Sequence, residues 1–174
     1  MENIKFYFAY GSNMNPERVK KRKVNFLTAE AATLSDFYLA FNKKSHVYPG
    51  AASANIVRLQ NEVPKLDRHP GVHFNQGVEG VLYQLEDAEQ IFSMDPFEGF
   101  PLRYSRIEVD VQTSRGQEKT WTYTANVDYL ADGLKPNNWY LNHLLSGQAY
   151  LSEAYFKALQ KIPTLPNSDL EPEG

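Results

Sequence analysis

The first apolar run of the chain predicts a buried strand. It spans Ile4–Tyr10, and aromatic side chains fill four of its seven positions. Aromatic residues favour strands because they fit a pleated, half-buried surface. The run ends at residues 11–13. Asn15, Pro16 and Glu17 then supply a helix cap, a proline for the first helical position and an acid for the first turn. A strand, a tight connection and a short helix are therefore expected.

Alternation between apolar and polar positions predicts further strands. Residues 107–111 alternate between aliphatic and acidic side chains, as in a strand with one face in water. The polar turn Thr113–Glu118 separates this strand from the next one and predicts a hairpin. The strands expected after the first are Asp36–Asn42, Ser53–Leu59, Gly77–Leu85, Tyr104–Gln112 and Lys119–Asn126.

The helical segments are few and short. Glu86–Met94 predicts an amphipathic helix that leads into the loop Asp95–Pro101, and Asn137–Leu145 and Glu153–Lys161 predict two more helices. The end of the chain carries prolines without an apolar period, so residues 164–174 are predicted to be a mobile tail after a single domain, 1–163. Long strands and short helices indicate a mixed α+β fold, whereas closure of a sheet into a barrel cannot be inferred from periodicity.

Composition narrows the class of protein. The chain has 174 residues, 42% of them apolar, which suits one folded domain. Its formal net charge of −3 gives no overall attraction to nucleic acid or anionic lipid. The absence of cysteine excludes disulfides, thiolate metal sites and a cysteine nucleophile. Neither a signal-peptide pattern nor a long apolar run is present, so a soluble, cytoplasmic protein is expected.

The connection Tyr10-Gly11-Ser12-Asn13 is the first candidate site. Glycine allows a close approach of the backbone to a ligand, and a helix start presents unpaired N–H groups that suit a carboxylate. The spacing matches neither a phosphate-binding loop nor the serine elbow of hydrolases. From the residues alone, a tight turn whose polar side chains satisfy local backbone groups is the favoured interpretation.

Glu98 is the second candidate. It lies between Phe97 and the run Gly99-Phe100-Pro101. A carboxyl group enclosed by aromatic side chains is desolvated, which raises its pKa and suits it to general acid/base catalysis. A solvated loop glutamate is the alternative. The neighbouring Asp95, followed by proline, is interpreted as a structural turn residue.

Three other signals favour ordinary structural roles. His69 and His73 have the spacing of a metal pair on a helix, but Pro70 and Gly71 between them disfavour a helix, and the surrounding segment 60–76 is polar. The basic run Lys20–Lys23 is typical of a solvated helix end. Trp121 and Trp139 are expected to pack in the core or at its rim.

Several of these residues together resemble the γ-glutamyl cyclotransferase family. The likeness covers about residues 4–163, and the N-terminal motif at this distance from the acidic segment is more specific than either alone. The matching residues are Phe8-Ala9-Tyr10-Gly11-Ser12-Asn13-Met14, Asp95-Pro96-Phe97-Glu98-Gly99, Tyr104, Tyr123, Pro136, Tyr140 and Gly147.

The resemblance implies a compact α+β fold with a small closed barrel and a pocket at one end. It implies that Glu98 is the catalytic acid/base and that the loop holds the substrate's α-carboxylate through backbone N–H groups. The substrate-binding residues that it implies are Tyr10, Gly11, Ser12, Asn13, Met14, Tyr104, Tyr123 and Tyr140. It also implies a place in glutathione metabolism. The expected partner is a small γ-glutamyl compound, with no cofactor, metal, nucleic acid or membrane, and the protein is expected to be a monomer or homodimer.

The implied reaction is an intramolecular cyclisation. The α-amine of a γ-glutamyl amide attacks the γ-carbonyl, which gives 5-oxoproline and a free amine, and Glu98 moves the proton. Substrates of this kind include γ-glutamyl amino acids, γ-glutamylamines and biosynthetic γ-glutamyl intermediates. A binding protein that keeps the pocket but turns nothing over is the alternative from a different class.

Overall fold

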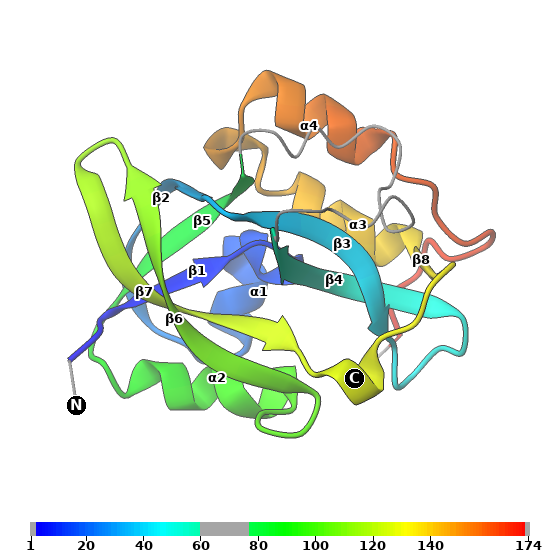
Figure 1. Ribbon diagram of the computed structural model, residues 1–174, viewed down its shortest axis with the longest axis horizontal. Helices are drawn as coiled ribbons and strands as arrows, with labels where there is room; N and C mark the ends of the chain where they lie inside the picture. The colour runs from blue at the N-terminus through cyan, green and yellow to red at the C-terminus, as the bar shows by residue number, and fades with distance from the viewer. Residues whose placement is uncertain (1–2, 60–76, 173–174) are drawn as a thin grey trace.

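The computed structural model describes residues 3–59 and 77–172, and its centre is a closed five-stranded barrel (Figure 1). The barrel closes where the first strand runs parallel to the last, with Tyr7 opposite Trp121. This confirms the α+β class and the small barrel that the resemblance implied. In their order around the barrel, the strands are β1 (Phe6–Ala9), β5 (Val78–Leu85), β2 (Phe26–Leu34), β6 (Tyr104–Thr113) and β7 (Gly116–Ala125).

A second sheet lies across the barrel (Figure 1). It contains β3 (Phe37–Lys44), β4 (Ala51–Arg58) and the two-residue β8 (Lys135–Pro136). Asn55 joins the sheets, because its Oδ1 accepts a hydrogen bond of 2.8 Å from the backbone N–H of Ala125 in the barrel. A residue of the second sheet is thereby held beside the end of β7.

The predicted strands and the hairpin occur with small shifts of their ends. The strand β2 was not predicted. Its sequence, FLTAEAATL, contains three alanines and one glutamate, residue types that are depleted in strands. The strand forms because it pairs with β5 from Phe26 to Leu34, and tertiary pairing outweighs the weak local preference.

The helices lie outside the barrel, with α2 on one side of it and α3 and α4 on the other (Figure 1). Asn15 caps α1 as predicted, since its side chain accepts from the N–H of Glu17 at 3.1 Å. The helices are α1 (Pro16–Lys21), α2 (Gln90–Glu98), α3 (Asn138–Leu145) and α4 (Glu153–Gln160), with 3-10 turns η1 (Ser12–Met14), η3 (Val127–Tyr129) and η4 (Gln148–Tyr150).

The helix predicted at Glu86–Met94 begins and ends four residues later than expected. Asp87 accepts hydrogen bonds from the N–H groups of Glu89 and Gln90, so this local turn precedes the helix. The helix then continues through Pro96 to Glu98 and ends at Gly99, whose φ of 68° is the left-handed conformation favoured after a helix. Glu98 is therefore the last residue of α2 and not part of a loop.

Candidate functional site

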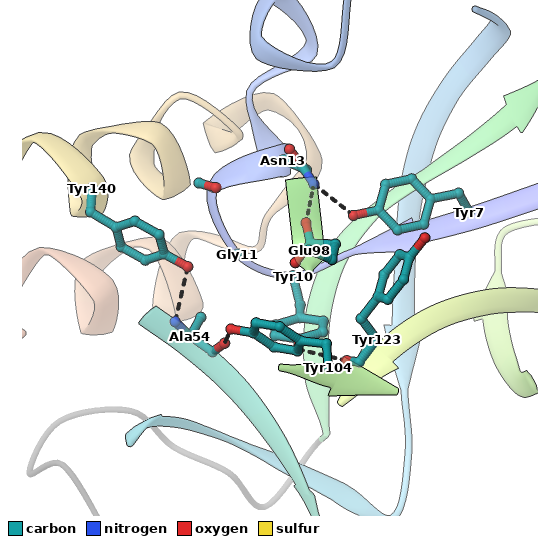
Figure 2. Close-up of a pocket in the computed structure, with 10 residues that line it drawn as sticks. Tyr7, Tyr10, Gly11, Asn13, Ala54, Glu98, Tyr104, Tyr123 and Tyr140 are labelled. Carbon is teal, nitrogen blue, oxygen red and sulfur yellow. Dashed lines mark hydrogen bonds between the residues drawn. The ribbon is translucent and has the colours of Figure 1, made fainter. Parts of the chain in front are cut away.

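A pocket opens at one end of the barrel, where β1 leads into η1 (Figure 2). Five tyrosines form much of its wall. The pocket contains every site residue predicted from the sequence except Met14, although their roles in binding and catalysis stay predictions. Its lining residues are Tyr7, Tyr10, Gly11, Ser12, Asn13, Ala54, Glu98, Tyr104, Tyr123 and Tyr140.

Glu98 projects into this pocket from the end of α2 (Figure 2). Its Oε1 accepts a hydrogen bond of 3.0 Å from Nδ2 of Asn13 and lies 3.4 Å from a guanidinium nitrogen of Arg22. The carboxyl side chain is only 17% exposed. The hydrogen bond from Asn13 and the cation of Arg22 hold the carboxylate at this position in the pocket.

The phenylalanines next to Glu98 do not enclose it, contrary to expectation. Phe97 is 50% exposed and Phe100 is 37% exposed. Each lies under a guanidinium, that of Arg22 for Phe97 and that of Arg106 for Phe100. The aromatic surroundings of the carboxylate come instead from the tyrosines of the pocket wall.

Asn13 holds the two charged groups together. It is buried, its Oδ1 accepts from Arg22 at 2.9 Å, and its Nδ2 lies 2.8 Å from the hydroxyl of Tyr7 as well as 3.0 Å from Glu98. The backbone carbonyl of Asn13 accepts from the hydroxyl of Tyr83 at 2.7 Å. These bonds fix the amide, so Glu98 is presented to the pocket in one position.

Arg22 departs from the expected solvated basic helix end. Its side chain is 14% exposed and pairs with Glu98. Burial lowers the pKa of Arg22, and the charge of Glu98 opposes this effect. Since the loss of one member of a buried pair leaves an uncompensated charge, Arg22 and Glu98 depend on each other.

Gly11 provides space at the pocket rather than a special backbone angle. Its φ is −111°, which other residues adopt. A Cβ atom at this position would lie 3.1 Å from the hydroxyl oxygen of Tyr140 and 3.3 Å from Cβ of Ala54. The 3-10 turn that follows leaves its first N–H groups outside the helical hydrogen bonds, as the predicted carboxylate site requires.

Replacement of Gly11 by alanine is expected to narrow the pocket without unfolding the protein. The new methyl group would press on the tip of Tyr140, which can shift by a few tenths of an ångström. For the γ-glutamyl substrate that the sequence resemblance implies, we expect KM to rise about tenfold, equivalent to about 1.4 kcal/mol, while the melting temperature changes little. Steady-state kinetics and thermal melting measure both. An unchanged KM would show that the substrate does not approach this turn.

The tyrosine hydroxyls divide into two groups. Three of them donate to fixed protein acceptors: Tyr10 to the carbonyl of Tyr123 at 2.7 Å, Tyr104 to the carbonyl of Ala54 at 2.8 Å, and Tyr123 to Asp95 at 2.7 Å. Tyr7 and Tyr140 are acceptors in their bonds from Asn13 and from the N–H of Ala54.

Each of these five hydroxyls stays protonated at neutral pH. Burial raises the pKa of the tyrosines above the usual value, for Tyr7, Tyr10 and Tyr104 well above it. The O–H groups of Tyr7 and Tyr140 have no hydrogen-bond acceptor among the described residues. They are therefore the two tyrosine donors in the wall that can serve a ligand.

Asp95 does not line the pocket itself but contacts Tyr123, which does. It lies inside α2 rather than in a turn, and it pairs with Arg106 at 2.6 Å while accepting from Tyr123. Arg106 in turn stacks on Trp121. Asp95 thus holds the ring of Tyr123 in the wall.

Met14 was predicted to be a substrate-binding residue, but it does not line the pocket. It is fully buried in the core, and its Cβ would lie 3.0 Å from a Cβ added at Gly147. The site also contains residues that were not predicted from the sequence, namely Tyr7, Ala54 and Arg22. The sequence carries no local signal for Ala54 or Arg22, whereas the aromatic β1 had already placed Tyr7 near the turn.

No group of three histidine, aspartate or glutamate side chains that could hold a metal ion occurs in residues 3–59 and 77–172. The pair His69 and His73, and the polar segment 60–76 around it, lie outside the described residues. Within the same ranges, no helix has the length and apolar character needed to cross a bilayer.

Comparison with known proteins agrees with this geometry. The sequence profile described as "Gamma-glutamyl cyclotransferase, AIG2-like" matches residues 7–142, which include every residue of the pocket wall. The chain belongs to this family. No match was found among curated protein sequences.

Solved structures show that the cyclotransferase fold extends over the whole chain. A protein described as "Gamma-glutamyl cyclotransferase" has 24% identity and a TM-score of 0.75, with coverage of 99% of this chain and 95% of the other. The uncharacterized human protein LOC79017 has 24% identity, a TM-score of 0.76 and the same coverage. A yeast γ-glutamyl cyclotransferase specific to glutathione has 14% identity and a TM-score of 0.63, with coverage of 91% and 94%.

The pocket at the end of the barrel continues into a second, outer cavity of about 240 Å³. The two share Ser12, Glu98, Tyr104 and Tyr140, so Glu98 stands at the boundary between them. Trp139, expected in the core or at its rim, lines this outer cavity.

The end of the chain forms part of the outer wall. Glu171 pairs with Arg18 at 2.5 Å and with His143 at 2.7 Å, and the N–H of Trp139 donates to the carbonyl of Ser168 at 3.0 Å. Residues 164–172 thus contact α1 and α3. The predicted mobility of this tail is a statement about motion and stays a prediction.

Proposed function

We propose that this protein is a γ-glutamyl cyclotransferase that converts a γ-glutamyl amide to 5-oxoproline and a free amine. The observation that carries the proposal is the position of Glu98, a partly buried carboxylate held by Asn13 at the boundary between a small inner pocket and a larger outer cavity. The inner pocket suits the glutamyl head and the outer cavity suits the leaving group.

In the proposed reaction the substrate supplies its own nucleophile. The α-amine gives a proton to Glu98 and forms a bond to the γ-carbonyl carbon. The bond between this carbon and the leaving nitrogen then breaks, and Glu98 returns the proton to that nitrogen. The second proton that the α-nitrogen loses on becoming the lactam N–H follows through the same carboxylate, so the amine leaves as an ammonium ion. Proton transfer from an α-ammonium group of pKa ~8 to a free glutamate of pKa ~4.3 costs about 5 kcal/mol. Intramolecular orientation, with effective molarities of about 10⁵–10⁸ M, can offset a cost of this size.

The oxyanion formed at the γ-carbonyl needs hydrogen-bond donors. Tyr7 and Tyr140 are suited to this role, since both hydroxyls line the pocket and neither donates to an acceptor among the described residues. Preformed donors in an enclosed site stabilise such a charge more than water does. In this proposal the N–H groups of the turn Gly11–Asn13 bind the α-carboxylate of the substrate.

Release of 5-oxoproline tests the proposal directly. Purified protein is expected to form 5-oxoproline from at least one compound in a panel of γ-glutamyl dipeptides and γ-glutamylamines, without added metal or cofactor. Chromatography with mass detection measures the product. If calorimetry shows that members of the panel bind but none is turned over, the protein is a binding module of the same fold and the proposed activity is wrong.

A further inference from the structure

The outer cavity is positively charged although the chain as a whole is negative. Its lining has four side chains that are cationic at neutral pH (Arg18, Arg22, Lys43 and Arg103) and two carboxylates (Glu98 and Glu171), with His46 at the rim. The cavity therefore has a surplus of two positive charges when His46 is neutral, within a protein whose net charge is −3.

Among the residues that the structure describes, acidic partners are found for only two of these cations. Arg18 pairs with Glu171 and Arg22 pairs with Glu98. Neither Lys43 nor Arg103 forms an ion pair within the described part of the chain. The two carboxylates of the lining are thus already engaged, and the surplus charge belongs to Lys43 and Arg103.

Lys43 is the more unusual of the two. Its residue is only 4% exposed, and its ammonium group lies 5.3 Å from the centre of the Tyr104 ring in the pocket wall. Burial, and after it the charge of Arg103, lower the pKa of Lys43 to about 8, although the charge of Glu98 opposes both. A buried cation beside a second cation is costly for the free protein. An anionic ligand would remove this cost.

The position of the cavity identifies the ligand group. If the glutamyl head fills the inner pocket, the scissile bond lies beside Glu98 and the leaving amine extends into the outer cavity. A neutral or cationic amine would leave Lys43 and Arg103 without a counter-charge. A leaving group with one carboxylate for each would neutralise both, and a volume of about 240 Å³ is sufficient for one amino acid.

We propose that the outer cavity selects leaving groups that carry two negative charges, so that the preferred substrates are γ-glutamyl derivatives of acidic amino acids, bound by Lys43 and Arg103. This inference rests on the proposed function and specifies its substrate. The same surplus of charge disfavours γ-glutamylamines, whose leaving groups bring no carboxylate.

Three substrates that differ only in the leaving group provide the test: γ-glutamyl-glutamate, γ-glutamyl-alanine and γ-glutamyl-ethylamide. We expect kcat/KM to fall in this order, by about tenfold for each carboxylate that is removed. Equal kcat/KM values for the three would overturn the inference and leave the proposed function intact. Absence of 5-oxoproline from all three would overturn the proposed function, and this inference with it.

Substitutions of Lys43 and Arg103 test whether these two side chains cause the preference for acidic leaving groups. In Lys43→Gln and Arg103→Gln, the ratio of kcat/KM for γ-glutamyl-glutamate over γ-glutamyl-alanine is expected to fall about tenfold. Lys44→Gln is the matched control, because Lys44 follows on the same strand but is exposed and outside the cavity lining. Lys43→Arg should keep the ratio, which separates the loss of charge from a folding defect. An unchanged ratio in folded Lys43→Gln and Arg103→Gln would contradict the assignment.

The preference should also depend on pH. Lys43 is charged below a pKa of about 8 and neutral above it, so the ratio for γ-glutamyl-glutamate is expected to fall as the pH rises through about 8. The titratable or charged groups that face Lys43 are Arg103, His46, Glu98 and Tyr104, and the pKa of buried Tyr104 is too high for it to titrate there. Lys43→Arg should abolish this dependence, and its persistence would assign the titration to another group.

Discussion

Replacement of Glu98 by glutamine is expected to lower kcat by about 10²–10⁴-fold, the range over which general acid/base catalysis contributes. The amide has nearly the same shape and can keep the hydrogen bond from Asn13, so the substrate should still bind. It cannot accept the proton of the α-amine at neutral pH. The variant is therefore expected to lose turnover with little change in substrate affinity, as measured by 5-oxoproline release and calorimetry.

Glu89→Gln is the matched control for this experiment. Glu89 is an exposed residue that precedes α2, the helix that ends with Glu98, and the substitution should leave kcat within about twofold. Turnover by folded Glu98→Gln at a rate close to that of the unsubstituted protein would refute the catalytic role. Loss of both turnover and binding would instead indicate that the carboxylate organises the pocket.

Replacement of Asn13 by aspartate is the second change with a large expected effect. A carboxylate at this position would lie about as close to Glu98 as the present amide nitrogen, which is 3.0 Å from Oε1. Two carboxylates at this separation cannot both be ionised easily, and the donor that orients Glu98 is lost. A displacement of about 1 Å in such a site can cost about 10²-fold in rate, and we expect a fall in kcat of that order.

Asn15→Asp makes the same chemical change two residues away. Asn15 caps α1, a role that aspartate also fills, and it lies outside both cavities. It should retain kcat and thermal stability. If Asn13→Asp is folded and fully active, the amide of Asn13 is not needed to position the carboxylate.

The parts of the fold that the sequence predicted are those with a strong local signal. The aromatic run of β1, the Asn-Pro-Glu start of α1 and the alternation in β6 each specify their structure within a few residues. Closure of the barrel depends on the pairing of Tyr7 with Trp121, which are far apart in the chain and show no common pattern. The strand β2 depends in the same way on its partner β5.

The candidate site also combines residues that could be predicted from the sequence with residues that could not. Tyr10–Asn13 and Glu98 could be predicted because they occur in two motifs with recognisable spacing, and the structure places both motifs at one pocket. Arg22 and Lys43 could not, because each looks like an ordinary surface base in the sequence. Their burial follows from contacts with residues distant in the chain, Glu98 and Phe97 for Arg22 and Tyr104 for Lys43, which local periodicity does not encode.

The second sheet supplies part of the walls of both cavities, and this affects how substrate preference can evolve. Glu98, Asn13 and Tyr7 belong to the barrel or to segments attached to it, whereas Lys43 and Ala54 belong to β3 and β4, neighbouring strands joined along their length. The residues proposed to cleave the bond and Lys43, proposed to select the leaving group, thus belong to different parts of the fold. Changes confined to β3 can therefore redirect the proposed reaction to another leaving group, provided that β4 keeps Ala54, which holds Tyr104 and Tyr140 in the pocket wall.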